Sequence, residues 1–354
     1  MAQLINFSQF TADNGAVTRI SELAFTIAWL NGELSTVFNV MTGQKDGKKI
    51  DFVDSIDDIA TAGRGCDPEY QNITPKGFEK EWQMGDYSIP IEICADSWRN
   101  TIAKYALKTG TAMDDLTGTE IIEKVLMPLI DRAYTEALWR MSWFGDKSAA
   151  NISDSGKITN GVNVKLLNMV DGLWKRIQAI VAANPEQKIT IAANAQTSYA
   201  TQKSALTPAL ALQTVEDVLS AADGRIFNNG GKLMMTNAFY QKLRKGYNQE
   251  YKATIPFENV SRGVSISEFD GIQILVFNEW DQSIKKFENS GTALNLPYRV
   301  VYANPDNLLI GTEDKNMVAD MDLWFDKKDR KNRMYASSNI GTLVAEDDLI
   351  QVAL

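Results

Sequence analysis

The last fifty residues constrain the fold of this chain most, because they read as a succession of β-strands separated by turns. Residues 304–310 begin with a turn signal, Asn-Pro-Asp-Asn, and continue as an apolar run that predicts a buried strand. Residues 320–325 alternate between acidic and apolar side chains, which places Asp320 and Asp322 on the same face of a strand. Residues 340–354 contain two further strand-like runs. This part of the chain is therefore expected to complete a sheet, and it carries no candidate catalytic group.

Composition excludes several classes of function. The chain has 354 residues, of which 44% are apolar, so it can bury the core of one large domain or of two. It contains no histidine, the commonest general base and metal ligand. Cys66 and Cys94 are too few and too far apart for a zinc site, and we expect free thiols. The formal net charge of −9 contrasts with the basic character of most proteins that bind nucleic acid through its phosphates. No signal peptide and no membrane span are expected.

Residues 46–95 are rich in charge and glycine, and they predict a long β-hairpin. Phe78, Trp82 and Met84 fall on one face of the predicted strand. After a change of parity at Gly85, which indicates a bulge, Tyr87 and Ile89 fall on one face of the continuing strand. An isolated hairpin is only marginally stable, so this aromatic face needs a surface to lie on. The residues alone leave two possibilities open, the chain's own core or another molecule.

The strongest predicted helix covers residues 118–144. It opens with the capping-box pattern Thr-Gly-Thr-Glu at 117–120 and keeps a helical apolar stripe as far as Met141. Gly145 is a plausible stop. A second helix is predicted from about Ser97 to Lys108. Residues 156–304 then alternate between helical and strand-like runs, which is typical of a mixed α/β domain.

No candidate enzyme site stands out from its structural alternative. Gly230-Gly231-Lys232 lacks the other residues of a phosphate-binding loop and reads as a turn before a strand. The acidic pairs, including Asp320 and Asp322, are expected on solvated faces or at helix caps rather than as a glycosidase pair. A basic cluster at residues 239–247 could contact nucleic acid, but a helix with its aromatic residues inward and its lysines outward gives the same pattern. We therefore expect no catalytic residue, no cofactor and no metal.

The order of these segments resembles the major capsid protein of tailed phages, the Hong Kong 97-like fold. The resemblance covers nearly the whole chain and rests on the order rather than on any single motif. It implies an α+β fold that consists of an N-terminal arm (1–45), an extended E-loop (46–95), a peripheral domain with a long spine helix (96–155), a mixed α/β axial domain (156–304) and return strands of the peripheral domain (305–354).

The resemblance also implies two contact regions between subunits. The E-loop would lie across the neighbouring subunit, with Phe78, Trp82, Met84, Tyr87 and Ile89 as its anchors. The polar tip formed by Lys327, Lys328, Asp329 and Arg330 would meet its copies near local three-fold axes, where opposite charges set the geometry of pairing.

The function implied is that of a virion protein without enzymatic activity. Copies would assemble in the cytoplasm of a bacterial host, as hexamers and pentamers, into an icosahedral shell around double-stranded DNA that is contacted non-specifically. Expected partners are other copies of the chain, a portal protein, a separate scaffold protein and decoration proteins, and no membrane. Two alternatives remain open on the sequence: the shell of an encapsulin-like nanocompartment, and a soluble carboxylate-dependent hydrolase.

Overall fold

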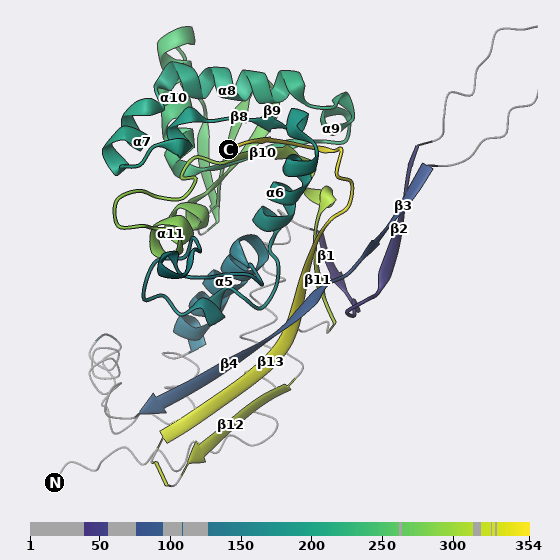
Figure 1. Cartoon of the computed structure of the whole chain (residues 1–354), viewed down its shortest axis with the longest axis vertical. Coiled ribbons are helices and arrows are strands. Elements are labelled where there is room, and N and C mark those ends of the chain that lie inside the picture. The colour runs from purple at the N-terminus through teal and green to yellow at the C-terminus, as the bar shows by residue number, and fades with distance from the viewer. Residues whose placement is uncertain are drawn as a thin grey trace, which may run out of the picture.

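The computed structural model describes residues 39–55, 76–94, 127–261, 264–313, 320–326 and 331–354, together with the single positions 108, 328 and 329. Within these residues the strands form a seven-stranded sheet, a five-stranded sheet and a two-stranded hairpin. The seven-stranded sheet and most helices lie at one end of the molecule, and the long strands of the five-stranded sheet extend away from it (Figure 1).

The seven-stranded sheet is the centre of the mixed α/β part. Its strands, in spatial order, are β5 (Lys188–Ile189), β14 (Ile350–Ala353), β10 (Val300–Ala303), β6 (Lys232–Thr236), β9 (Ile272–Phe277), β8 (Val264–Phe269) and β7 (Phe257–Ser261). Side chains of the central strands are buried on both faces, as in β10 and β14 where every residue is buried. Such strands read as continuous apolar runs rather than as alternating patterns.

Helices cover both faces of this sheet. Alternate strand residues point into two separate apolar clusters, so that Leu233 and Met235 pack with α8 and α10 while Met234 packs with α5, α6 and α11. The helices are α5 (Met127–Phe144), α6 (Leu173–Ala183), α7 (Tyr199–Ala205), α8 (Pro208–Ala221), α9 (Gly224–Asn228), α10 (Asn237–Tyr251) and α11 (Asn278–Phe287). Short 3-10 helices occupy Ile152–Asp154, Val164–Leu166, Pro185–Gln187, Ala192–Ala195 and Pro305–Asn307.

The five-stranded sheet is organised by its longest strand, β13 (Lys331–Val344). Along one edge, β13 pairs over its first half with β12 (Asp320–Asp326) and over its last residues with β11 (Leu308–Thr312), which in turn pairs with β1 (Asn39–Thr42). Along the other edge it pairs with β4 (Met84–Cys94) through eleven consecutive positions without a register shift. Apolar residues of β1, β4, β11 and β13 join this sheet to α5 and α6.

An aromatic cluster lies where α5, α6 and α11 meet. The Trp143 and Trp280 rings have centroids 4.4 Å apart in an edge-to-face arrangement, and the Trp174 ring lies 4.8 Å from that of Trp280. Arg299 is buried beside this cluster, where its guanidinium forms an ion pair with the buried carboxylate of Glu288 and lies 5.0 Å from the Trp174 ring centroid. Removing either charge would leave the other unpaired in the interior.

The observed strands add detail to the sequence-based division. The strand β4, which lies within the predicted E-loop (46–95), pairs with β13 in the five-stranded sheet. The strand β14 lies in the seven-stranded sheet, so the last residues do not return to the same sheet as β11 and β13. Gly85 forms no bulge; a Cβ at this position would lie 2.0 Å from the carbonyl oxygen of Met169, and close packing is the reason for glycine here.

Several predicted elements lie outside the described residues. These are most of the N-terminal arm, the outer part of the hairpin with Cys66, the helix at 97–107 and the first part of the helix predicted at 118–144. In the alternating region 156–304, a 3-10 turn at Val164–Leu166 precedes α6, which begins only after Gly172.

Candidate functional site

The hairpin formed by β2 (Lys49–Ser55) and β3 (Lys76–Glu81) projects from the body of the molecule (Figure 1). Within the described residues these strands pair only with each other, with a bulge between Val53 and Ser55. A two-stranded ribbon is marginally stable by itself, so its position depends on how its base is held.

The base of the hairpin is held by Trp82. This side chain is fully buried against β11 and β13, and a Cβ added at Gly311 would lie 2.7 Å from the indole atom Cζ3. A Cβ at Gly341 would lie 3.1 Å from Cε3 of the same ring. The Trp82 ring therefore packs directly against the backbone of Gly311 and Gly341, where a side chain would leave no room for it. Met84, Leu309 and Leu343 complete this cluster.

Polar contacts reinforce the same attachment. The Lys80 ammonium lies 2.5 Å from Oδ1 of Asp347 and donates to the Val344 carbonyl at 2.7 Å. The Trp82 backbone N–H donates to the carbonyl of Lys48 at 2.9 Å. The backbone N–H of Met84 donates to Oδ1 of Asp46 at 2.8 Å. The hairpin thus leaves the body from a fixed point.

The prediction that Trp82, Met84 and Tyr87 anchor a neighbouring subunit is wrong. All three side chains are buried inside their own chain, because β11, β13 and α5 already cover them. The Tyr87 hydroxyl lies 2.7 Å from that of Tyr134, and burial raises the pKa of Tyr87 to about 12. Strand alternation identified these residues as a buried face, but not which surface buries them.

Ile89 and Phe78 are the other two predicted anchors. Ile89 is partly buried against the same core as Tyr87, so little of it is available to a neighbour. The backbone of Phe78 lies in the projecting hairpin, where it pairs with Phe52, and its side chain lies outside the described residues. A contact made by Phe78 therefore stays a prediction.

The tip between β12 and β13 is polar, as the sequence predicts. Lys328 and Asp329 are exposed, whereas Lys327 and Arg330 lie outside the described residues. The Asp326 carboxylate accepts the backbone N–H of Lys328 at 2.9 Å, and this hydrogen bond is the main cause that lowers the pKa of Asp326. This hydrogen bond fixes the backbone of Lys328 relative to Asp326.

A network of ion pairs continues from the tip onto the sheet. The Arg333 guanidinium lies 2.6 Å from carboxylate oxygens of both Asp326 and Asp329, and 3.2 Å from Glu92 on β4. The Lys331 ammonium lies 2.5 Å from Glu92 and lowers the pKa of that carboxyl. Solvated pairs of this kind add little stability individually, but together they fix which charges face outward.

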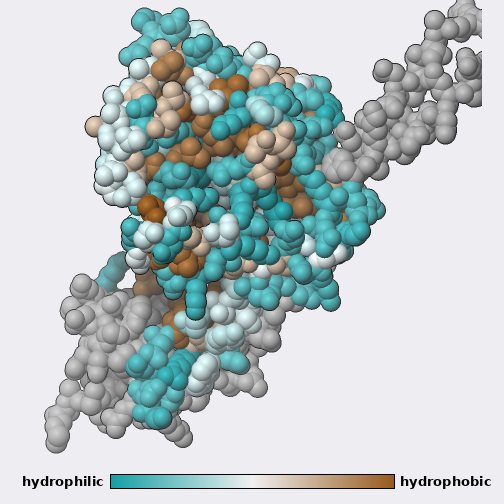
Figure 2. Space-filling model, viewed as in Figure 1, coloured by the Kyte–Doolittle hydropathy of each residue, from teal (hydrophilic) through white to brown (hydrophobic). Residues whose placement is uncertain are grey.

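The outer face of this sheet carries two aromatic side chains that sequence reasoning did not single out. Trp324 on β12 is 42% exposed and Tyr335 on β13 is 40% exposed, and the strand register places them as diagonal neighbours. The strand alternation contains the signal, because Trp324 shares its face with Asp322. Hydrophilic and apolar residues are interspersed over the described surface visible in Figure 2, so exposure alone does not mark a contact. Trp324 and Tyr335 are a candidate contact because they are exposed and adjacent on one face of the sheet.

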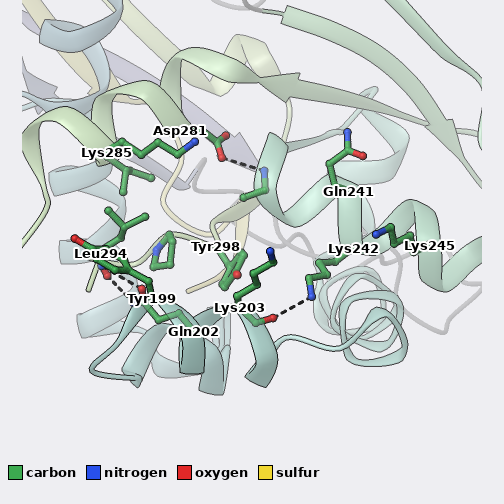
Figure 3. Close-up of a pocket in the computed structure, with 13 residues that line it drawn as sticks. Tyr199, Gln202, Lys203, Gln241, Lys242, Lys245, Asp281, Lys285, Leu294 and Tyr298 are labelled. Carbon is green, nitrogen blue, oxygen red and sulfur yellow. Dashed lines mark hydrogen bonds between the residues drawn. The ribbon is translucent and has the colours of Figure 1, made fainter. Parts of the chain in front are cut away.

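The basic cluster on α10 follows the structural alternative. Phe239 and Tyr240 are buried, whereas Lys245 is exposed and Lys242 is half-buried. These two lysines line a cavity of about 350 Å³ between α7, α10 and α11 (Figure 3). The turn predicted at Gly230-Gly231-Lys232 before β6 is observed at residues 229–230.

The acidic pairs do not form an enzyme site within the described residues. Asp347 is paired with Lys80, and Asp322 lies exposed on β12. Asp57-Asp58 and Asp114-Asp115 lie outside the described residues. Across the described part of the chain, no three histidine, cysteine, aspartate or glutamate side chains come together as a possible metal site. The helices described there include none that is long and apolar enough to cross a membrane.

The whole architecture can be compared with solved structures. It is similar to a chain of the satellite phage P4 procapsid including the size determination protein, with a TM-score of 0.51, 10% identity, and coverage of 94% of this chain and 98% of that chain. It is also similar to a chain of Gordonia phage Cozz, with a TM-score of 0.51, 9% identity, and coverage of 90% and 85%. The chain has a phage capsid fold. No protein-family model and no curated protein matches the sequence.

The phage capsid fold confirms the resemblance to tailed-phage major capsid proteins of the Hong Kong 97-like fold. The mixed α/β character of the chain, which the sequence predicted for residues 156–304, agrees with this fold.

Proposed function

We propose that the chain is a major capsid protein of a tailed phage. Its copies assemble as hexamers and pentamers into an icosahedral shell that encloses double-stranded DNA in the virion. Assembly takes place in the cytoplasm of the bacterial host, with a portal protein, a scaffold protein and decoration proteins as further partners. The proposal assigns the chain no catalytic step.

The observation that carries this proposal is the hairpin β2–β3, in a chain with a phage capsid fold. The hairpin is fixed at its base by Trp82 and Lys80, but its length extends beyond the body (Figure 1). A projecting ribbon with a rigid attachment is suited to lie on a second copy. The polar tip with Lys327, Lys328, Asp329 and Arg330, and the neighbouring Trp324 and Tyr335, supply a second proposed contact.

Weak contacts are sufficient for such a shell. A standard protein interface buries about 800 Å² per partner. When each subunit makes several interfaces and symmetry closes the assembly, the contacts act together and none needs to be very tight. Arg333 and its carboxylate partners would then select the geometry of pairing more than its strength.

The test is the physical state of the purified protein. We expect closed shells or ring-shaped capsomers by negative-stain electron microscopy, and nuclease-protected DNA in particles from infected cells. DNA-free shells that contain an enzyme would instead identify a nanocompartment. A chain that stays monomeric even when it is produced together with its neighbouring genes would refute the proposal.

A contact variant tests the second surface separately. Trp324→Ala removes an exposed aromatic side chain, so it should lower particle yield while the thermal unfolding of the isolated subunit stays unchanged. Lys165→Ala, at an exposed position of the mixed α/β part, serves as the control. Normal particle yield from Trp324→Ala would remove this face from the proposed contacts.

A further inference from the structure

The cavity between α7, α10 and α11 has the size of a small-molecule site. Its volume is about 350 Å³, near the lower end of the range for ligand pockets. Part of its wall is apolar and consists of side chains from α10, α11 and the segment before β10, namely Ala238, Ile284, Leu294 and Pro297. The cavity can therefore take up an apolar or aromatic group of a small ligand.

Four lysine side chains line this cavity from three helices. Lys203 belongs to α7, Lys242 and Lys245 belong to α10, and Lys285 belongs to α11. Within the described part of the chain, none of the four forms an ion pair with a carboxylate. In a chain whose formal net charge is −9, four such ammonium groups around one cavity favour an anionic ligand.

The acidic side chain in the lining does not neutralise these lysines. Asp281 accepts the backbone N–H groups of Asn237 and Ala238 at 2.6 Å and 3.0 Å, so its carboxylate serves the N-terminus of α10. Among the described residues that line the cavity, no other is acidic. Four positive charges and one negative charge leave the lining with a net charge of +3 when all five groups are ionised. A ligand with more than one negative charge therefore suits the cavity best.

Tyr298 presents a hydroxyl group to the cavity. Its side chain is only 6% exposed, and in Figure 3 it lies between Asp281 and Lys203. Its backbone is fixed, because the Asn194 amide donates to the Tyr298 carbonyl at 2.7 Å and accepts its N–H at 3.0 Å. The hydroxyl itself makes no hydrogen bond within the described part of the chain. Since buried polar groups are nearly always hydrogen-bonded, this hydroxyl is available to a ligand in the cavity.

The Tyr298 hydroxyl keeps its proton at neutral pH. Burial, and to a smaller extent the charge of Asp281, raises the pKa of Tyr298 above its usual value of 10.0. The hydroxyl can therefore donate a hydrogen bond to an acceptor atom of the ligand. Tyr298 is buried, whereas three of the lysines are exposed and Lys242 is half-buried. The acceptor atom thus belongs to the part of the ligand that enters the cavity, and the negative charges remain at the mouth.

A nucleoside phosphate has all of these features. Lysine ammonium groups bind phosphates, and a base has apolar faces together with ring nitrogen and carbonyl atoms that accept hydrogen bonds. Tyr199, which is 43% exposed, offers a ring on which a base can stack, and its hydroxyl donates to Oδ1 of Asn289 at 2.5 Å. An alkyl phosphate would leave the Tyr298 hydroxyl without an acceptor. An inorganic phosphate would leave the apolar wall without a partner.

We propose that this cavity binds a nucleoside phosphate. The phosphates lie at the mouth against Lys203, Lys242 and Lys285. The base lies against the apolar wall and accepts a hydrogen bond from the Tyr298 hydroxyl. The site belongs to a single subunit, so this proposal goes beyond the proposed shell function and does not depend on it.

The first test is isothermal titration calorimetry of the unassembled full-length protein in magnesium-free buffer. The probes are ATP, inorganic tripolyphosphate, which lacks the nucleoside, and adenosine, which lacks the phosphates. ATP should bind saturably, and at least tenfold more tightly than either of the other two, because only ATP engages the lysines and the apolar wall together. Its affinity should fall as salt rises.

A charge variant tests the lysines. Lys203→Gln/Lys285→Gln should lower the affinity for ATP at least tenfold, and it leaves in place Lys242, whose ammonium donates to the Lys203 carbonyl at 3.0 Å. Lys165→Gln/Lys188→Gln makes the same change in net charge at exposed positions elsewhere and should have little effect. If the cavity variant unfolds, Lys285→Gln is compared with Lys165→Gln in its place.

A second variant tests the part of the site that holds the base. Tyr298→Phe removes only the hydroxyl, so it should lower the affinity for ATP about two- to tenfold. The affinity for tripolyphosphate and the thermal unfolding of the protein should stay unchanged, because the hydroxyl has no partner in the described part of the chain. A purely structural role of Tyr298 would instead change both affinities together with the unfolding temperature.

Four results would overturn the proposal. The first is the absence of saturable ATP binding to the wild-type protein, and the second is tripolyphosphate binding as tight as that of ATP. The third is an equal loss of ATP affinity in the cavity variant and in the control variant. The fourth is tighter binding of octyl phosphate or of a single-stranded oligonucleotide than of ATP, which would make the ligand an aliphatic anion or a nucleic-acid strand. Each of these results leaves the proposed shell function standing, because particle formation is measured separately.

Discussion

Replacing Trp82 by alanine should destabilise the subunit strongly. The indole is fully buried between β11 and β13, and an aromatic side chain buries about 150–250 Å² on folding. At about 25 cal/mol per Å² this area corresponds to ~4–6 kcal/mol, which is an upper estimate. Measured losses for large-to-small core substitutions of this kind are about 3–5 kcal/mol. Because the indole Nε1 has no hydrogen-bond partner in the described part of the chain, no polar group loses a partner.

A second substitution tests the contact itself. Gly311→Ala places a Cβ 2.7 Å from the Trp82 ring, so alone it should cost about 1–3 kcal/mol through overpacking. In the Trp82→Ala background the ring is absent, and the same substitution should be close to neutral. The double-mutant cycle should therefore show a coupling energy of at least 1 kcal/mol.

The assay is guanidinium unfolding of the unassembled subunit, followed by far-ultraviolet circular dichroism. Unassembled protein is needed because association would add to the apparent stability. Trp324→Ala, at an exposed position on β12, is the matched control and should cost less than about 1 kcal/mol. If Trp82→Ala lowers the free energy of unfolding as little as this control does, the account of the hairpin base is wrong. It is also wrong if the free-energy changes of Trp82→Ala and Gly311→Ala are additive.

Three further predictions concern buried polar groups. Burial raises the pKa of Asp281 from 3.8 to about 6, so between about pH 4 and pH 6 the folded chain keeps a proton that the unfolded chain has released. The free energy of unfolding should therefore fall as the pH rises from about 4 to about 6. Asp281→Asn should reduce this fall when denaturation is measured as a function of pH. Glu288→Ala should cost about 3–5 kcal/mol because it leaves the Arg299 charge buried and unpaired, whereas Glu288→Leu with Arg299→Leu should cost less in the same assay. Tyr87→Phe should cost about 0.5–1.5 kcal/mol through loss of its hydrogen bond with Tyr134, and an unchanged denaturation midpoint would contradict this.

Local signals in the sequence predicted many elements correctly. The strand β9 follows the Asp270-Gly271 turn, where both residues have positive φ angles, and it is one of the strand-like runs expected within residues 156–304. The long helix ends at Phe144 before Gly145, as predicted. In these cases residues adjacent in the sequence determine the structure, so a pattern over a few positions is sufficient.

The sequence did not predict which sheet each strand joins, or which surface buries each strand face. The period of two along residues 84–93 identifies which side chains are buried, but it does not identify the burying surface, and the prediction for Trp82 failed for that reason. Likewise, nothing in residues 350–353 distinguishes a strand of one sheet from a strand of the other. The lysines of the cavity come from three helices far apart in the sequence, so only the fold brings them together.

The strand β13 has a mechanical consequence. Its fourteen residues span ~45 Å, from the charged turn at Lys331 to the carbonyl of Val344 that accepts the Lys80 ammonium. Gly341, near the C-terminal end of β13, packs against the indole ring of Trp82. Neighbouring strands pair with it along this whole length, so it bends little. In the proposed shell, a displacement of the charged turn at one contact would therefore move the projecting hairpin at another contact, because no flexible segment separates the two.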